Sequence, residues 1–108
     1  MGKHFLLNLY DCSQSLLDNE TFIIKLIEDS AVLCGATILK TISHKFKPVG
    51  VTAICLLSES HISIHTWPEE FKAACDVYTC GNTNPEVACE NIIESLNCKF
   101  HELQRVDR

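Results

Sequence analysis

The chain alternates six short stretches of strand-like hydrophobicity with two longer stretches of helical period. The stretch at 51–58, "VTAICLLS", is nearly all apolar, which is typical of a central strand. The stretch at 61–67, "HISIHTW", alternates polar and apolar residues with period two. Turn sequences at 47–50 and 81–85 separate neighbouring stretches. The six predicted strands are 4–12, 36–46, 51–58, 61–67, 75–80 and 98–106.

The first helical stretch covers residues 18–35. Asp18 or Asn19 can cap its start, and Gly35 ends it. The side chains expected near one face are Phe22, Ile23, Leu26, Ile27, Ser30 and Leu33.

The second helical stretch covers residues 85–97, with Asn84 as the expected cap and Pro85 at the first helical position. The order is therefore β-α-β-β-β-β-α-β. Strands joined by such short turns pair antiparallel, and two helices can cover only one face of a sheet. The pattern predicts a single α+β domain over residues 1–108, a two-layer α/β sandwich with both helices on one face.

Composition removes several classes of function. Apolar residues make up 46% of the 108, and 14 acidic residues against 9 Lys and Arg give a net charge of -5. Because there is no basic run, we expect no nucleic-acid partner. No apolar span of membrane length and no secretion signal occur, so we expect no membrane contact and a cytoplasmic protein. The seven cysteines are scattered without a CxxC, which favours reduced, mostly buried thiols and no metal site.

The stretch 61–67 concentrates the polar chemistry on one side of its strand. If His61 and His65 lie on one strand, their imidazoles are roughly 13 Å apart, which excludes chelation of one metal ion by this pair. A partly exposed polar sheet face stays as the simplest interpretation of the pattern alone. One side carries His61, Ser63, His65 and Trp67, and the other carries Ile62, Ile64 and Thr66.

The segment "SESHISIHTWPE" at 58–69, followed by "YTCGN" at 78–82, resembles the bacterial-type S-adenosylmethionine decarboxylases. The resemblance extends to "GATIL" at 35–39 and "HKFKPVG" at 44–50, so it covers most of the chain. These are short pyruvoyl-dependent enzymes of spermidine synthesis. The resemblance implies that the chain makes its own pyruvoyl cofactor and decarboxylates S-adenosylmethionine, releasing the aminopropyl donor.

By this resemblance, the Ser60 hydroxyl attacks the carbonyl carbon of Glu59 and replaces the peptide with an ester. β-Elimination then leaves a dehydroalanine, which hydrolyses to a pyruvoyl group and ammonia. Only a residue whose Cβ carries both the nucleophile and the leaving group can perform both steps. The chain is thereby divided into residues 1–59 and 60–108.

The same resemblance assigns roles to three further residues. His65 corresponds to the histidine that removes the Cα proton of residue 60 during processing. Thr52 occupies the place of a hydroxyl residue that is usually serine in the family, although an ordinary strand threonine explains it equally well. Cys80 corresponds to the proton donor that reprotonates Cα after carbon dioxide leaves the Schiff base between substrate and pyruvoyl, and a free thiol can give up its proton near neutral pH.

Three residues correspond to substrate contacts of the family. Phe46 and Trp67 match aromatics placed against the substrate, whose sulfonium is attracted to an aromatic face by roughly 0.5–2 kcal/mol. Glu69 matches a carboxylate that can accept hydrogen bonds from both ribose hydroxyls. We expect its neighbour Glu70 to be a solvent-exposed charge.

Two alternatives differ from this hypothesis in substrate or in class. A pyruvoyl enzyme of the same type could decarboxylate arginine or another basic amino acid, because Ser60, His65 and Cys80 serve any α-amino acid. A non-enzymatic paralogue would keep the fold and remain a single chain. Trp67 and Glu69 favour the nucleoside substrate.

Spacing along the strand predicts a site shared by two chains. Ser60 and His65 are separated by five residues, or roughly 16 Å in an extended strand. The stretch contains no Gly or Pro that would bend it. We therefore expect a homodimer of cleaved protomers in which His65 of one chain serves Ser60 of the other.

Overall fold

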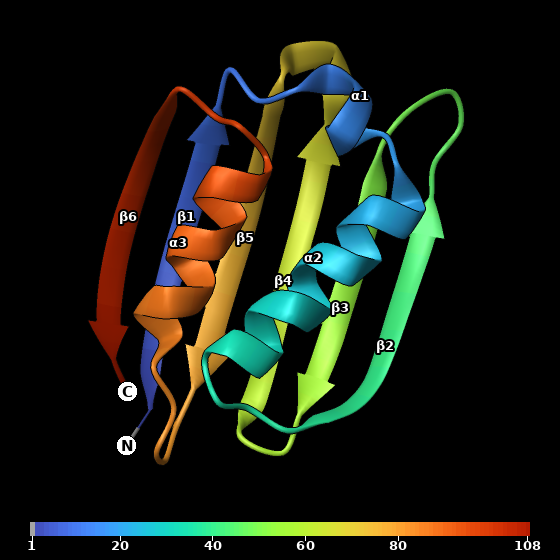
Figure 1. Cartoon of the computed structure of the whole chain (residues 1–108). Coiled ribbons are helices and arrows are strands. Elements are labelled where there is room, and N and C mark those ends of the chain that lie inside the picture. The colour runs from blue at the N-terminus through green and yellow to red at the C-terminus, as the bar shows by residue number, and fades with distance from the viewer. Residues whose placement is uncertain (1) are drawn as a thin grey trace.

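A six-stranded antiparallel sheet forms one layer of the protein, and the main helices form the other (Figure 1). The structure is a computed structural model that describes residues 2–108. The strands lie side by side in the order β2-β3-β4-β5-β1-β6. The elements are β1 (Lys3–Tyr10), α1 (Gln14–Leu17), α2 (Glu20–Leu33), β2 (Ile38–Lys45), β3 (Val51–Leu57), β4 (Ser60–Trp67), the 3₁₀ helix η1 (Pro68–Glu70), β5 (Lys72–Thr79), α3 (Pro85–Ser95) and β6 (Phe100–Asp107).

The predicted α+β sandwich is confirmed, with three local differences. The sequence pattern missed α1 and η1, because four and three residues are too few to show a helical period. It also began β5 at Cys75, whereas the strand starts at Lys72. The missed residues include two alanines, which have little strand preference and are held here by their neighbours β1 and β4.

Both main helices begin at the predicted positions, and α2 also ends where predicted, whereas α3 ends at Ser95, two residues before the predicted end. Asn19 caps α2, since its side chain accepts a hydrogen bond from the backbone N–H of Phe22 at 3.0 Å. The helix ends at Leu33, and Gly35 follows with a φ of 86°, a left-handed conformation that suits glycine. Pro85 is the first residue of α3, although the side chain of the cap residue Asn84 makes no capping hydrogen bond.

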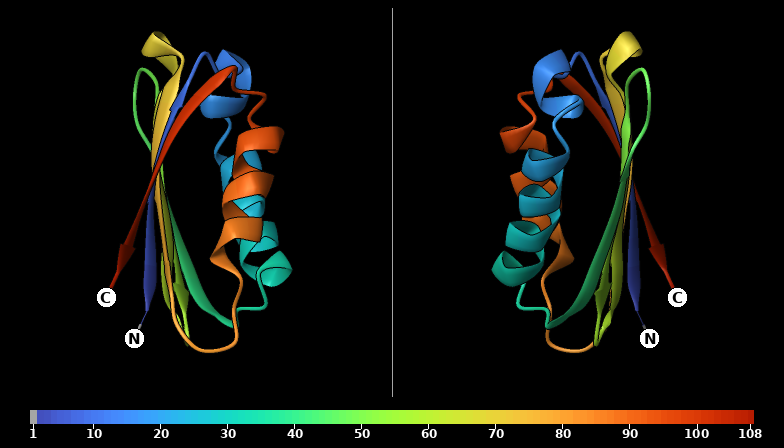
Figure 2. Two further views of the ribbon diagram at one scale, coloured as in Figure 1. Left: turned by 90° about the vertical axis from the view of Figure 1, so that its left-hand side faces the viewer. Right: turned by 90° about the vertical axis from the view of Figure 1, so that its right-hand side faces the viewer.

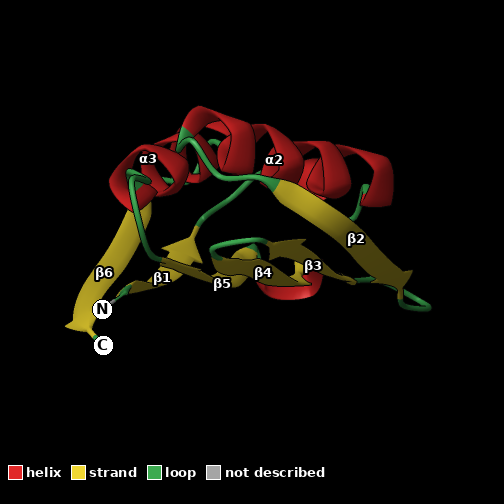
Figure 3. Cartoon of the chain, turned by 90° about the horizontal axis from the view of Figure 1, so that it is seen from below, coloured by secondary structure: helices red, strands yellow, loops and turns green. Residues whose placement is uncertain are grey.

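The core lies between the helices and one face of the sheet, and within residues 2–108 no α-helix lies against the other face, which is called the helix-free face below. Edge-on views show α2 and α3 on the same side (Figure 2), and the view from below shows them together over the sheet (Figure 3). No helix within the described residues is long and apolar enough to span a membrane. Fully buried core side chains include Leu7, Leu9, Ile23, Ile27, Ile62, Ile64 and Ile92. The helix-free face exposes Leu6, Ile42, Ile54, Leu56 and Trp67.

Candidate active site

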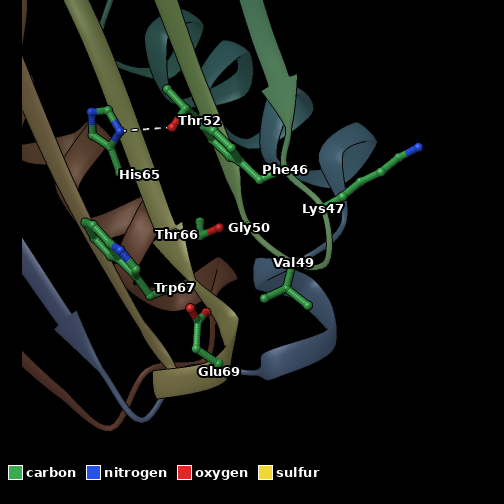
Figure 4. A pocket seen from close by; sticks show the side chains of 9 residues that line it. All are labelled: Phe46, Lys47, Val49, Gly50, Thr52, His65, Thr66, Trp67 and Glu69. Carbon is green, nitrogen blue, oxygen red and sulfur yellow. Dashed lines mark hydrogen bonds between the residues drawn. The ribbon is translucent and has the colours of Figure 1, made fainter.

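The residues singled out from the sequence lie in two groups at opposite ends of β4. Ser60 begins this strand, and Trp67 ends it. The first group, at the β3–β4 turn, contains Glu59, Ser60 and Cys80. The second group lines a pocket beside the β2–β3 loop and contains Phe46, Thr52, His65, Trp67 and Glu69 (Figure 4).

At the turn, a thiol contacts the peptide that the resemblance marks for cleavage. The Sγ of Cys80 donates a hydrogen bond to the carbonyl oxygen of Glu59 at 3.1 Å. The Glu59 side chain is turned away and accepts from the backbone N–H of Thr37 at 2.9 Å. Ser60 has a φ of 151°, which is unusual for a residue with a side chain. The peptide bond between Glu59 and Ser60 thus has a polarised carbonyl on its Glu59 side and a strained backbone on its Ser60 side.

Cys80 differs from the other six cysteines in exposure. Its side chain is exposed, whereas Cys98 is half-buried and the remaining five are buried. Burial raises the pKa of Cys12 and of Cys89 to about 12, so these thiols stay protonated at neutral pH. The prediction of mostly buried thiols is confirmed, and no disulfide joins any of the seven within the described residues.

The pocket at the other end of β4 measures about 440 Å³, a size typical of small-ligand sites. Its lining is mixed, with two exposed aromatic rings and one carboxylate among polar backbone and side-chain groups. The Lys72 ammonium lies 5.5 Å from the ring centroid of Trp67, so this aromatic face already attracts a cation. The lining residues are Phe46, Lys47, Val49, Gly50, Thr52, His65, Thr66, Trp67 and Glu69.

Thr52 and His65 are joined across β3 and β4. They are direct partners in the strand register, and Thr52 Oγ1 lies 3.0 Å from His65 Nδ1. This hydrogen bond orients the imidazole and ties the hydroxyl to it. Chemically, the pair resembles a base held by an orienting group, with the second ring nitrogen free to meet a reacting proton.

Asp18 holds the loop that carries Phe46, although the sequence pattern indicated it as one of two possible helix caps. Its Oδ1 accepts a hydrogen bond from the Gly50 backbone N–H at 2.8 Å and lies 3.0 Å from Lys45 Nζ. Both contacts lower the pKa of Asp18, and the hydrogen bond from Gly50 has the larger effect. The backbone N–H of Phe46 also donates to Gly50 at 2.8 Å. No local sequence signal shows this role, because it depends on a contact between distant segments.

Gly50 is required in that loop by its backbone conformation. Its φ is 114°, which is unfavourable for any residue with a side chain, although an added Cβ would make only ordinary van der Waals contact, at 3.4 Å from the carbonyl oxygen of Thr66. The tight backbone therefore holds Phe46 at the mouth of the pocket.

The two groups do not meet within one chain. The register between β3 and β4 runs without interruption from Thr52–His65 to Leu57–Ser60, so no bulge shortens the strand. Residues 60 and 65 are then roughly 16 Å apart along β4. His65 does not approach its own Ser60.

A third cluster lies on the helix-free face. Its members belong to three different strands: His4 on β1, His61 on β4 and Asp76 on β5. Their ligand atoms all lie within 4.8 Å of one another, so this set could hold a metal ion. His65 is not part of the cluster, in agreement with the argument against a His61–His65 chelate.

Comparison with known proteins assigns the family. The family model described as S-adenosylmethionine decarboxylase matches residues 3–108. A Synechococcus protein named S-adenosylmethionine decarboxylase proenzyme is 51% identical over 105 residues, which cover 96% of this chain and 82% of the relative. The chain belongs to the S-adenosylmethionine decarboxylase family. The resemblance found in the sequence is therefore confirmed.

Other members of this decarboxylase family agree in sequence and in fold. A Methanococcus aeolicus proenzyme is 48% identical over 97 residues, covering 89% of this chain and 83% of its own. The crystal structure of the adenosylmethionine decarboxylase from Aquifex aeolicus superposes with a TM-score of 0.93 at 38% identity. The match covers 100% of this chain and 90% of that one. The predicted class, a decarboxylase with an α+β fold, is confirmed.

Proposed function

We propose that this protein is the proenzyme of a pyruvoyl-dependent S-adenosylmethionine decarboxylase that supplies the aminopropyl donor for spermidine synthesis. The observation that carries the proposal is the Cys80 thiol on the carbonyl of Glu59, directly before the strained Ser60, in a chain of this family. The family's names favour S-adenosylmethionine over a basic amino acid as substrate. We also propose a cytoplasmic enzyme, because seven cysteines without a disulfide suit a reducing compartment.

Self-cleavage divides the chain into residues 1–59 and 60–108. Ser60 Oγ attacks the carbonyl carbon of Glu59, and the bond from that carbon to the Ser60 nitrogen breaks. The Cys80 thiol stabilises the negative charge on the Glu59 oxygen during this attack, as donors in an oxyanion hole do. A base then removes the proton on Cα of residue 60, and the carboxyl of Glu59 leaves from Cβ. Water then hydrolyses the resulting dehydroalanine to the pyruvoyl group and releases its nitrogen as ammonia. The residues present at the turn thus fit the formation of a pyruvoyl group from Ser60.

In turnover, the pyruvoyl group supplies an electron sink for the pair released when carbon dioxide leaves. The chain's own residues protonate and bind the substrate. Cys80 donates the proton that replaces the lost carboxyl. Trp67 and Phe46 bind the sulfonium and the adenine, and Glu69 accepts hydrogen bonds from the ribose.

We further propose that two chains form a homodimer before cleavage and that the cleaved protomers stay paired and share both active sites. The two groups of site residues lie at opposite ends of β4, so a two-fold axis across the helix-free face would bring one copy's turn against its partner's pocket. His65, oriented by Thr52, then serves as the base for Ser60 of the partner. The apolar side chains exposed on that face favour burial against a second sheet.

The proposal is tested by intact-mass measurement of the purified protein under denaturing conditions, together with carbon dioxide release. We expect two fragments divided between Glu59 and Ser60, the second without a free amino group, and release from S-adenosylmethionine but not from arginine. An active decarboxylase composed of uncleaved chains would contradict the pyruvoyl mechanism. Cleaved chains that act only on arginine would contradict the substrate assignment.

A further inference from the structure

One carboxylate ties together three strands beside the proposed cleavage point. Asp76 Oδ2 accepts from His61 Nε2 at 2.9 Å and from His4 Nε2 at 2.8 Å, and Asp76 Oδ1 accepts from Ser63 Oγ. Burial would raise the pKa of Asp76, but the hydrogen bonds from Ser63, His61 and His4 outweigh it and lower that pKa. Tyr78 packs against both imidazoles, with ring centroids 5.0 Å from His4 and 5.9 Å from His61.

His61 occupies a special place in this cluster because it directly follows residue 60. In the uncut chain, the β3–β4 turn holds residue 60 covalently. After cleavage that tether is lost, and residue 60 becomes the free end of β4. The pair of His61 and Tyr78 is the first in the register between β4 and β5, so residue 60 lies beyond the last backbone partner on that side.

On the β5 side of that register, the chain leads from Tyr78 to Cys80. Tyr78 pairs with His61, and Cys80 follows two residues later on the same side of the molecule as the cut. The tie from His61 to Asp76 therefore links the strand that bears the pyruvoyl group to the strand that leads to the proton donor. The His61 ring is 35% exposed and depends on Asp76 and Tyr78 to hold it.

We propose that His61, held by Asp76, is a positioning residue that keeps the new end of β4 in register with Cys80 after self-cleavage. The inference rests on the proposed function. Before the cut, the intact turn already fixes residue 60, so His61 is dispensable for processing. After the cut, residue 60 keeps its pairing with Leu57 on β3, and its distance from the Cys80 thiol on the β5 side depends on the hydrogen bond between His61 and Asp76. Proton transfer is sensitive to such distances, so loss of the tie misdirects the proton.

The test compares His61→Leu, which removes the donor, with His61→Gln, whose amide can still donate to Asp76. Both variants are expected to self-cleave to completion. In His61→Leu, kcat should fall about tenfold, which corresponds to about 1.4 kcal/mol, while KM changes little. A larger share of turnovers should put the proton on the former keto carbon of residue 60. Hydrolysis would then leave the substrate's nitrogen on the chain as an alanine end group, seen by mass on fragment 60–108, and release the decarboxylated substrate as an aldehyde. His61→Gln should restore most of kcat and the normal end group.

Ser63→Ala is the matched control, because Ser63 donates to the same carboxylate from the same strand but lies further from the cut. We expect near-normal kcat and no extra alanine end. Normal kcat and end group in His61→Leu would overturn the inference. So would an equal loss in Ser63→Ala, or a loss of processing in parallel with activity. Uncleaved or inactive wild-type protein would instead contradict the proposed function itself.

Discussion

At the scale of single residues, Cys80 is the position to which we assign two tasks. Its thiol contacts the carbonyl of Glu59 in the uncut chain, and the same thiol is the proposed proton donor to the substrate after the cut. The motif "YTCG" indicated the second role through the family resemblance. The contact that supports the first role depends on the β3–β4 turn lying against the end of β5, and only the structure reveals it.

We therefore expect Cys80→Ala to affect processing and turnover to different extents. A neutral thiol is a weak hydrogen-bond donor, so its loss should slow self-cleavage by about tenfold without preventing it. Decarboxylation should fall by about a hundredfold or more, because the proton donor is absent. Time courses of fragment formation and carbon dioxide release measure the two effects. Normal turnover in the cleaved variant would show that Cys80 is not the donor.

The substrate contacts are tested at the same scale. Trp67→Leu and Glu69→Gln should each lower kcat/KM for S-adenosylmethionine by about tenfold, because one cation–π or charge-assisted contact contributes about 1–2 kcal/mol. Self-cleavage should proceed normally in both. Glu70→Gln is the control, since Glu70 is exposed and lies 3.3 Å from Lys72 outside the pocket lining. If both variants keep wild-type kinetics, the pocket does not bind the substrate.

At the scale of elements, the hydrophobic pattern predicted both main helices and all six strands. The two helices and the four inner strands each have a periodic face buried against the other layer, whereas the edge strands β2 and β6 contain no fully buried residue. It did not indicate the strand order. Short turns explain why β2 to β5 are sequential neighbours, but β1 lies between β5 and β6, and no turn joins it to β5. This placement depends on long-range pairing, which local sequence does not encode. The β2–β3 loop was predicted as a turn, but its anchor Asp18 was not.

That anchor leads to a prediction about the loop. Asp18→Ala removes the hydrogen bond to Gly50 and the ion pair to Lys45, so the loop carrying Phe46 should loosen. We expect KM to rise about fivefold, equivalent to about 1 kcal/mol for one lost hydrogen bond, with kcat nearly unchanged. Asp29→Ala, which removes an exposed ion pair with Lys25 on α2, is the control and should leave KM unaltered. An unchanged KM in Asp18→Ala would show that the loop needs no anchor.

At the scale of the whole molecule, the sequence predicted that Ser60 and His65 are separated, but it did not show which other candidate residues accompany each of them. Strand spacing alone indicated that Ser60 and His65 are too far apart, and the uninterrupted register of β3 and β4 agrees. The structure adds that the pocket residues accompany His65 at one end of β4 and that Cys80 accompanies Ser60 at the other. This separation supports the proposed two-fold pairing of sheets, in which each chain contributes one group of residues to each site.

A charge placed on the helix-free face should therefore separate the two chains. Ile54 lies on β3 with 44% of its surface exposed, and Ile54→Lys should give a monomer that neither cleaves nor decarboxylates efficiently. Val32 on α2 is 65% exposed on the helical side, and Val32→Lys should remain a fully active dimer. Sedimentation velocity measures both. A fully active monomeric Ile54→Lys protein would contradict the shared site.

The most direct measurement of the shared site mixes two inactive chains. Ser60→Ala and His65→Ala proteins, given different mass tags, are unfolded and refolded together. The intact mass of each chain is then measured by mass spectrometry. In a heterodimer, Ser60 of the His65→Ala chain faces an intact His65 from its partner, so we predict that this chain alone is cut between Glu59 and Ser60 and that the mixture regains activity. If heterodimers form and every chain stays uncut, or if the wild-type enzyme is active as a monomer, the shared-site account is wrong.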